Sequence, residues 1–597
     1  MTKNKHTEIG EIDSINGNVI SIRLSDNIKS TMPIINGVVY RVGQIGSFLK
    51  IPLGFANLYG IVTQIGSAAI PDNLKELILQ NYEKIKNTRW LNMVLVGEQN
   101  GNKFERGVTQ FPTTGDKAHL VTIQDLDVIY GGFQASNSIT VGNLSLSESL
   151  NAKMDLDKLI SRHCAIVGST GSGKSNLVAV LLEAIANKNF KSSRILVIDP
   201  HGEYNETLKN KSRVFKINAS IKEKELHIPF WALPFDELMK IFPGNLSDIN
   251  NDYIREKIVE KKIKSAEENK LGIEKEVITA DSPIPFSLKK LWFELDDFER
   301  QTFKESRKPE TVTIKRVTGN AQELISNEYE PATAGGGSPF LNNQAKGILG
   351  FLDGIRRRLK DSCYNFLFLP GDWEPDLNGK VKKDLDDLLF MWLGDEKPVT
   401  ILDLSGIPSE IVASISGALL NTVYDALFWG QNTKVGGKQQ PLLIVLEEAH
   451  NYLKAGESSI SSRTVQNIAK EGRKYGVGLL LVTQRPSELD ETVLSQCGTM
   501  IALRMNNSKD RGHIKSAVQD ELQTMVDLLP SLRTGEGLIS GEAVKIPSRV
   551  KFYKISNAPK SADPKASEQW LIVQPIKKEY TTTVKYWRNQ KLSLKKE

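Results

Sequence analysis

A glycine-rich segment, GSTGSGKS at residues 168–175, constrains the fold of this chain more than any other feature. It follows the short apolar run CAIVG (164–168) and precedes LVAVLLEAIANK (177–188), which has the composition of a helix. The segment fits the pattern G-x-x-x-x-G-K-[ST], in which the turn between a strand and a helix wraps around the phosphates of a nucleotide. RILVIDP (194–200) is a second buried strand, so strand, helix and strand follow one another as in a parallel sheet. The sequence therefore predicts an α/β fold with a P-loop NTPase core, RecA-like and with a mainly parallel sheet.

The residue types in this loop suit the binding of ATP and Mg²⁺. Glycines allow the tight turn and let backbone N–H groups point at phosphate oxygens, and the start of the helix adds the positive end of its dipole. Lys174 reaches the β and γ phosphates as a point charge, which makes it a candidate catalytic residue, and the hydroxyl of Ser175 ligates Mg²⁺. The candidate nucleotide-binding residues are Gly168, Ser169, Thr170, Gly171, Ser172, Gly173, Lys174, Ser175 and Asn176.

A pair of carboxylates ends another apolar run, LLIVLEEAH at residues 442–450. A P-loop NTPase needs one carboxylate beside the hydrated Mg²⁺ and one that positions the attacking water. The order of the residues assigns Glu447 to the metal and Glu448 to the water, as a catalytic residue. The first position is usually Asp, and Glu is one methylene longer, so the division of labour between the two stays open.

Two further segments supply candidates that sense the nucleotide or complete the site. In the run LLLVTQRP, Gln484 ends an apolar strand and is placed to sense the γ-phosphate through the attacking water. In the segment EGRKYG, Arg473 is a candidate arginine finger that enters the site of a neighbouring subunit. Lys474 and Arg485 are the alternatives for this role.

The segment VIDPHGEY (197–204) adds carboxylates at the end of the strand expected beside the P-loop strand. Asp199 is a candidate metal residue, and Glu203 follows it in the loop. Either carboxylate can hold the hydrated metal or tune the site.

The hydrophobic pattern divides the chain into five parts. Short Val- and Ile-rich runs, punctuated by Gly and Asn, are typical of a small β-barrel at 1–145. The ATPase core is expected in two parts, 146–204 and 396–555, separated by a charged, mainly helical insertion at 205–395. The tail, 556–597, holds nine Lys or Arg and four Asp or Glu, so its net charge is +5.

The composition excludes several other classes of protein. Hydrophobic residues make up 40% and charged residues 25%, which is the balance of a globular protein and not of a disordered or fibrous one. The net charge of +6 is too mild to indicate nucleic-acid binding by itself. The cysteines, Cys164, Cys363 and Cys497, form no CxxC pair, which fits a reducing compartment. The N-terminus lacks a signal-peptide core and the longest aliphatic runs are of strand length, so we expect a cytoplasmic protein without a membrane segment.

Together these motifs resemble the HerA family of FtsK/HerA P-loop ATPases. Their order and spacing agree with that family over roughly 150–555. The N-terminal β region and the helical insertion resemble the small barrel and the helical bundle of the family. The matching segments are SRHCAIVGSTGSGKSN (161–176), VIDPHGEY (197–204), ILDLSGIP (401–408), LLIVLEEAHNYL (442–453), IAKEGRKYGVGLLLVTQRP (468–486) and SGEAVKIPSRV (540–550).

The resemblance implies a homohexameric ring that uses ATP to move double-stranded DNA through its pore. ATP would lie between subunits, with the P-loop and the Glu pair on one side and Arg473 on the other. Archaeal relatives are similar in working with a NurA-type nuclease, and bacterial relatives resemble motors that serve a sirtuin-like NADase or another nuclease in antiphage defence. No part of this chain resembles such an effector, so the effector is expected to be a separate protein.

Two other functions stay open. The ring can be chiefly a scaffold whose nucleotide state switches a bound effector, with little DNA translocation. A secretion or conjugation ATPase of the same superfamily fits less well, because no membrane segment is expected. ATP hydrolysis stimulated by DNA, together with displacement of a roadblock, separates a translocase from a scaffold.

Overall fold

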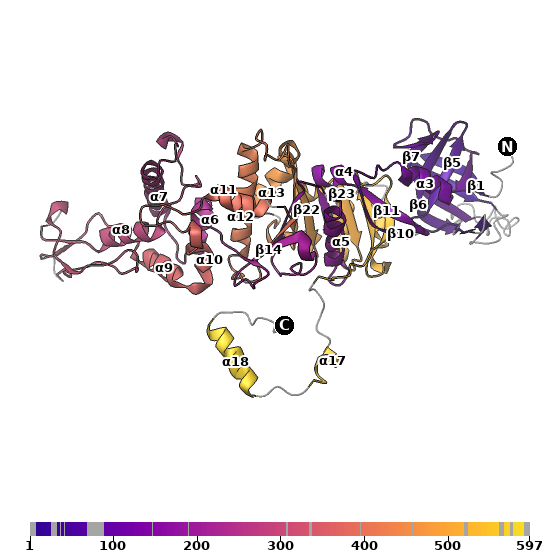
Figure 1. Cartoon of the computed structure of the whole chain (residues 1–597). Coiled ribbons are helices and arrows are strands. Elements are labelled where there is room, and N and C mark those ends of the chain that lie inside the picture. Colours follow the sequence, from indigo (N-terminus) through magenta and orange to yellow (C-terminus); the bar gives the residue numbers. More distant parts are fainter. Residues whose placement is uncertain are drawn as a thin grey trace, which may run out of the picture.

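The computed structural model places three parts of the chain in a row (Figure 1). A β-barrel lies at one end, a large sheet with its helices lies in the middle, and a set of helices lies at the other end. The helix that the sequence indicates near 73–87 falls outside the described residues. The structure describes residues 7–25, 33–35, 38–40, 42–67, 89–145, 147–188, 190–305, 308–333, 337–394, 396–454, 456, 459–518, 523–559, 566–572 and 577–589.

Six antiparallel strands close the N-terminal barrel. They pair in the order β2-β1-β9-β5-β6-β7, and β2 also pairs with β7, which closes the ring. Alternate side chains point inward, and inner residues such as Ile20, Ile22, Leu49 and Ile51 are fully buried. This confirms the small barrel expected from the sequence. The strands are β1 (Glu8–Asn16), β2 (Val19–Leu24), β5 (Phe48–Leu53), β6 (Ala56–Ser67), β7 (Arg89–Asn100) and β9 (Lys117–Leu120), with β8 (Lys103–Arg106) beside β7 and the separate short pair β3 (Ile34–Ile35) and β4 (Val38–Val39).

A sheet of twelve strands forms the middle of the molecule, in the order β11-β10-β25-β24-β23-β12-β22-β21-β13-β20-β14-β15. The strands from β23 to β15 run parallel to their neighbours, and the others pair antiparallel. Strands β12, β21 and β22 are unbroken apolar runs because they are buried on both faces. The bounds are β10 (Ser138–Leu144), β11 (Ser147–Asp155), β12 (Cys164–Val167), β13 (Arg194–Asp199), β14 (Ser212–Lys216), β15 (Lys224–Glu225), β20 (Val399–Asp403), β21 (Leu442–Leu446), β22 (Val477–Thr483), β23 (Thr499–Leu503), β24 (Glu536–Gly541) and β25 (Ser548–Phe552).

Strand β10 precedes residue 145, where the sequence places the end of the barrel, yet it belongs to the large sheet. It pairs with β11 and with β25, and Gly142 lies opposite Phe552. A β-rich pattern predicts strands but does not say which sheet they join. The pairing of β10 with β25 brings the start and the end of the ATPase core together.

Helix α5 (Lys174–Ala186) begins directly at the P-loop. Its N-cap, Gly173, has φ +105°, a left-handed conformation that residues with a Cβ rarely adopt. Leu177, Leu181 and Leu182 are fully buried and anchor the helix in the main core. The other helices of the barrel and the core are α3 (Ile123–Gly131), α4 (Leu156–Ser161), α12 (Val412–Trp429), α13 (Ile460–Glu471), α14 (Glu491–Ser495), α15 (Ser508–Ala517) and α16 (Gln523–Val526).

The insertion expected at 205–395 begins later than the sequence indicates, because β14 and β15 lie within this range and belong to the large sheet. The rest of the range forms most of the helices at the far end of the molecule (Figure 1). The indole N–H groups of the buried Trp231 and Trp292 donate to the backbone oxygens of Trp373 and Leu352, each at 3.0 Å. These bonds join segments far apart in the sequence into one packed unit. The helices are α6 (Phe235–Ile241), α7 (Asp248–Glu268), α8 (Leu288–Arg300), α9 (Leu349–Lys360), α10 (Asn365–Phe368) and α11 (Leu385–Leu389), and the short strands are β16 (Thr302–Phe303), β17 (Lys315–Val317), β18 (Glu328–Tyr329) and β19 (Phe340–Leu341).

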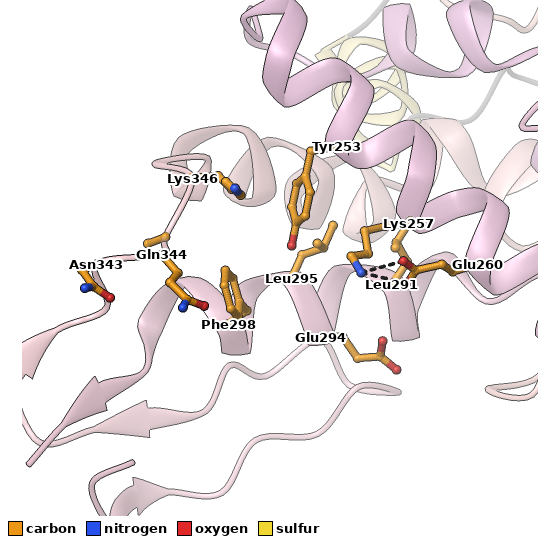
Figure 2. A pocket seen from close by; sticks show the side chains of 11 residues that line it. Tyr253, Lys257, Glu260, Leu291, Glu294, Leu295, Phe298, Asn343, Gln344 and Lys346 are labelled. Atoms are coloured by element: carbon orange, nitrogen blue, oxygen red, sulfur yellow. Dashed lines mark hydrogen bonds and ion pairs between the residues drawn. The ribbon is translucent and has the colours of Figure 1, made fainter. Parts of the chain in front are cut away.

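A cavity of about 670 Å³ opens between α7, α8 and the segment before α9 (Figure 2). Tyr253 and Phe298 contribute aromatic rings to its lining, and Lys257 pairs with Glu260 at 2.8 Å on one side. Figure 1 shows α7 and α8 at the end of the molecule remote from α5. This cavity is therefore separate from the P-loop.

After β25 the chain continues into two short helices, α17 (Ala566–Gln569) and α18 (Lys577–Arg588). No side chain of α18 is buried. In the part of the chain that the structure describes, no helix combines the length and the apolar character needed to cross a membrane.

Candidate active site

The carboxyl ends of four neighbouring parallel strands carry the residues that the sequence singles out. Strands β12, β22, β21 and β13 are adjacent in the sheet, and Val167 of β12 lies opposite Thr483 of β22. Since parallel strands end at the same edge, the P-loop after β12, Gln484 after β22, the Glu pair after β21 and Asp199 at the end of β13 come together there.

The side chain of Lys174 forms hydrogen bonds within the P-loop. Its Nζ donates to the backbone oxygens of Gly168 at 3.0 Å and of Ser169 at 3.2 Å. Burial lowers the pKa of Lys174, and nearby carboxylates, Glu448 foremost, oppose that shift. The ammonium group is thus held inside the loop, where phosphate oxygens can take over its two carbonyl contacts.

Glycine is required at two positions of the loop. A Cβ on Gly168 would lie 2.6 Å from Oγ of Ser172 and 2.8 Å from Cβ of Leu503, too close for any side chain. Gly171 has φ +71°, in the left-handed region that favours glycine. The backbone of the loop can therefore turn tightly around a ligand.

Neighbouring strands brace the loop. Oγ1 of Thr170 donates to Oε1 of Gln484 at 2.6 Å, so Gln484 lies directly against the P-loop. Ser169 donates to the backbone oxygen of Arg504 through both its backbone N, at 3.0 Å, and its Oγ, at 2.9 Å. The loop is thus tied to the ends of β22 and β23.

The two residues after Lys174 lie in the first turn of α5. Ser175 follows Lys174 directly, as the sequence pattern requires. The side-chain amide of Asn176 is engaged elsewhere: Nδ2 donates to the backbone oxygen of Tyr553 at 2.8 Å, and Oδ1 accepts from the backbone N of Ile555 at 3.1 Å. Asn176 therefore links the P-loop helix to the chain that follows β25.

Glu447 is a buried carboxyl group. Burial raises its pKa to about 8, and the neighbouring carboxylates of Asp199, Glu203 and Glu448 act in the same direction. The hydroxyl of Tyr204 donates to Oε1 of Glu447. A cation at this position would restore the ionised form, because an opposite charge favours the carboxylate.

Glu448 stands in a strained backbone conformation, with φ +48°, which is uncommon for a residue other than glycine. Its Oε2 is buried and accepts no hydrogen bond among the described residues, although Nδ1 of His450 lies 3.2 Å away. His450 is also 3.1 Å from Oγ1 of Thr483, and burial lowers its pKa. The unpartnered Oε2 of Glu448 can therefore accept from a water molecule or bind a cation.

Asp199 is fully buried and organises the loop after β13. Its Oδ1 accepts from the backbone N of His201 at 3.1 Å and of Gly202 at 2.8 Å, and its Oδ2 accepts from that of Tyr204 at 3.1 Å. Burial raises the pKa of Asp199 to about 7. Oε2 of Glu203, by contrast, is buried without a hydrogen-bond partner among the described residues. The sequence leaves open whether Asp199 or Glu203 holds the hydrated metal. Of these two, Glu203 has the oxygen without a hydrogen-bond partner.

Arg473 lies at the opposite edge of the sheet. It is exposed on the turn Gly472–Tyr475, directly before β22 begins. β22 has seven residues, so about 20 Å separate this turn from the edge that holds the P-loop. Lys474 is exposed on the same turn, whereas Arg485 follows β22 at the P-loop edge and pairs with Glu488 at 2.9 Å. Arg473 therefore cannot serve the P-loop of its own subunit.

The P-loop and the acidic residues together fit a nucleotide with Mg²⁺. The unpartnered oxygens of Glu203 and Glu448 are groups that a hydrated cation would satisfy. Across the described ranges, no three His, Cys, Asp or Glu side chains converge into a preformed metal cage. Mg²⁺ does not need such a cage, because it keeps several waters and binds through one or two protein oxygens and the phosphates of the substrate.

Tyr204 and His450 are site residues that the sequence did not single out. Tyr204 is the last residue of VIDPHGEY and contacts Glu447, and His450 ends LLIVLEEAH and lies against Glu448. Their place inside these two motifs was the signal available. Their roles depend on which strands are neighbours, and a single sequence does not give that.

The chain is similar to several known proteins. Two family models match the chain: the Helicase HerA central domain over residues 139–423 and the Helicase HerA-like C-terminal domain over residues 415–586. The DNA double-strand break repair helicase HerA of Pyrococcus furiosus is 27% identical over 457 residues, which are 74% of this chain and 73% of that protein. The protein of the same name from Saccharolobus solfataricus is 24% identical over 546 residues, 90% of this chain and 93% of that protein.

Among solved structures, VirB4 of Thermoanaerobacter pseudethanolicus is 16% identical with a TM-score of 0.45, and the match covers 71% of this chain and 98% of that one. The two family matches overlap, and together they span the P-loop, the Glu pair and Gln484. The chain thus belongs to the HerA helicase family and is an ATPase of the P-loop class.

Proposed function

We propose that the protein is a motor that hydrolyses ATP with Mg²⁺ to move double-stranded DNA, and that it works as a homohexameric ring. One observation carries this proposal: Lys174, Glu447, Glu448 and Gln484 meet at one edge of the sheet, while Arg473 is exposed at the other edge. In a head-to-tail ring a neighbouring subunit can place such an exposed cation opposite the P-loop.

Each residue then has one task. Lys174 and the loop amides bind the phosphates, and Ser175 and Glu447 hold Mg²⁺, directly or through its waters, with Glu203 close by. The metal would neutralise phosphate charge. Glu448 positions the attacking water and accepts its proton, and Gln484, bonded to Thr170, registers the terminal phosphate. Asp199 keeps the intervening loop in place.

The partners follow from the same proposal. The names of the relatives from Pyrococcus and Saccharolobus support DNA as the polymer that is moved. The five parts expected from the sequence give a barrel, a core split by the insertion, and a basic tail. We expect a separate effector, a NurA-like nuclease, a sirtuin-like NADase or another nuclease, because no segment of this chain resembles one.

The test of this function is ATP hydrolysis with and without linear double-stranded DNA. A translocase is expected to hydrolyse ATP several times faster with DNA, and to respond more to double-stranded than to single-stranded DNA of equal mass. A ring that only switches an effector would hydrolyse at the same rate in all three conditions, and this result would reject the proposal.

Lys174→Ala is expected to weaken nucleotide binding by about 10- to 100-fold, the range for losing a charged hydrogen-bond donor. Titration with the non-hydrolysable β,γ-imido analogue of ATP measures this change. Lys103→Ala, which removes an exposed lysine of the barrel, is the matched control and should bind like the wild type. An affinity within about twofold of wild type for Lys174→Ala would reject the P-loop assignment.

Deletion of the tail, 556–597, is expected to lower the oligomer mass measured by light scattering. The tail combines its positive charge with exposed apolar groups, a mixture that suits a strap across a neighbouring subunit. Changing Lys577 and Lys578 to Gln is the control that removes charge but keeps the apolar groups. An unchanged hexamer after the deletion would show that the tail is a solvated terminus. The exposed groups are Trp570, Leu571, Ile572, Tyr580, Tyr586 and Trp587.

A further inference from the structure

This inference rests on the proposed function, in which the site binds ATP. The order of the strands then sets the direction in which the nucleotide lies in the site. Glu448 follows β21 and Gln484 follows β22, both on one side of the P-loop strand β12. The terminal phosphate must face these residues, because they act on it or on the attacking water. The nucleoside therefore leaves the loop toward the other side of β12, where β23, β24, β25 and β10 follow in order.

The end of β25 lies beside the P-loop on that side. The backbone N of Gly535 donates to the oxygen of Ser172 at 3.0 Å, and the backbone N of Phe552 donates to the oxygen of Gly535 at 2.9 Å. The amide of Asn176, two residues after Lys174, holds the backbone at 553 and 555 through the bonds described above. Tyr553 is thus the first residue after β25 and lies next to the first turn of α5.

Tyr553 is held at its backbone and at its hydroxyl, and it is partly exposed. Its backbone N donates to the oxygen of Val141 at 3.1 Å, and its hydroxyl lies 3.2 Å from Oδ1 of Asn143 and 3.1 Å from Oδ1 of Asn151. The residue is nevertheless 40% exposed. No aromatic ring or cation among the described residues packs against it. A partly exposed aromatic ring that is held in place, beside the region where a nucleoside must emerge, is a surface for a base.

We propose that Tyr553 stacks on the base of the bound nucleotide and that Asn176 positions it. The loop before α5 holds the phosphates, and the ring of Tyr553 after β25 holds the base. Two segments far apart in the sequence thus contact the two ends of the ligand. Stacking uses the π face of a base and not its hydrogen-bonding edge. The ring therefore contributes to the affinity for purine nucleotides in general, and Asn176 couples its placement to the P-loop helix.

Two ligands measure separately how the base and the phosphates contribute to binding. The β,γ-imido analogue of ATP carries both, and inorganic tripolyphosphate carries only the phosphates. Calorimetric titration of the full chain with each probe, in the presence of Mg²⁺, should show that Tyr553→Ala weakens the analogue by about 5- to 100-fold, the range for loss of one stacked base. The affinity for tripolyphosphate should stay within about twofold. Tyr553→Phe should lose less affinity for the analogue than Tyr553→Ala, since it keeps the ring.

The controls distinguish a base platform from a structural role. Phe111→Ala removes an aromatic side chain of the barrel that is 53% exposed, and it should change neither affinity. Tyr553→Leu keeps an apolar side chain without a π face, and it replaces Tyr553→Ala if the latter does not fold. Asn176→Ala should weaken the analogue but not tripolyphosphate.

An unchanged affinity for the analogue in Tyr553→Ala, or an equal loss for both probes, would overturn the proposal. Failure of the P-loop assignment has another signature, because Lys174→Ala would then leave the affinities for both probes unchanged.

Discussion

Arg473→Ala is expected to lower the rate of ATP hydrolysis by about 10³- to 10⁵-fold, the range for removal of an arginine finger. Nucleotide binding and ring mass should stay close to those of the wild type, because Arg473 lies about 20 Å from the P-loop edge of its own subunit. The cation would stabilise charge that develops in the neighbour's transition state. Lys470→Ala, which removes an exposed cation from the last turn of α13, is the control and should keep most of the activity.

Mixed rings test whether Arg473 acts on the neighbouring subunit. Lys174→Ala subunits keep an intact Arg473, and Arg473→Ala subunits keep an intact P-loop. Some interfaces of a mixed ring then pair both intact parts, so hydrolysis should partly return when two inactive proteins are combined. Absence of any recovery in rings shown by mass to be mixed would contradict action between subunits, or it would require that all sites of a ring hydrolyse ATP together.

Arg485 is the alternative candidate for the arginine finger. It follows β22 at the P-loop edge of the sheet and is paired with Glu488. A normal Arg473→Ala enzyme, together with recovery in rings that mix Lys174→Ala with Arg485→Ala, would move the finger to Arg485.

Glu448→Gln is expected to bind ATP like the wild type but to hydrolyse it about 10²- to 10⁴-fold more slowly, the contribution typical of a general base. Gln keeps the size of the side chain, so the strained turn at φ +48° need not change. The amide cannot accept the proton of the attacking water, which removes the function without removing the site. Single-turnover hydrolysis together with a binding titration measures the two effects separately.

Glu447→Gln provides the matched comparison, since it makes the same chemical change one residue earlier. Its main effect should be a higher Mg²⁺ concentration for half-maximal activity, because Glu447 is buried beside Tyr204 on the metal side. If Glu447→Gln retained ATP binding and normal Mg²⁺ dependence but lost hydrolysis, while Glu448→Gln needed more Mg²⁺, the two assignments would have to be exchanged.

The P-loop was predictable from the sequence because its chemistry is local. Strand, glycine-rich turn and helix are consecutive, and the structure places Lys174 at the start of α5 with Gly173 in the left-handed conformation that the turn needs. The closed barrel was also predictable, since alternating apolar residues and short turns specify antiparallel strands. In both cases the pattern and the contacts lie within a short stretch of chain.

Contacts between distant segments were not predictable. The hydroxyl of Tyr204 donates to Glu447, which lies 243 residues further along the chain. Asn176 follows the P-loop in sequence, yet its amide binds the chain near Tyr553, more than 370 residues away. The order of strands decides these contacts, and a single sequence carries no signal for it.

The most direct test of the central claim is displacement of a protein roadblock from linear double-stranded DNA. We predict that the wild-type ring, given ATP and Mg²⁺, removes a tightly bound protein from the DNA, and that Glu448→Gln binds ATP and assembles but removes none. Hydrolysis of ATP without displacement of the roadblock would contradict translocation.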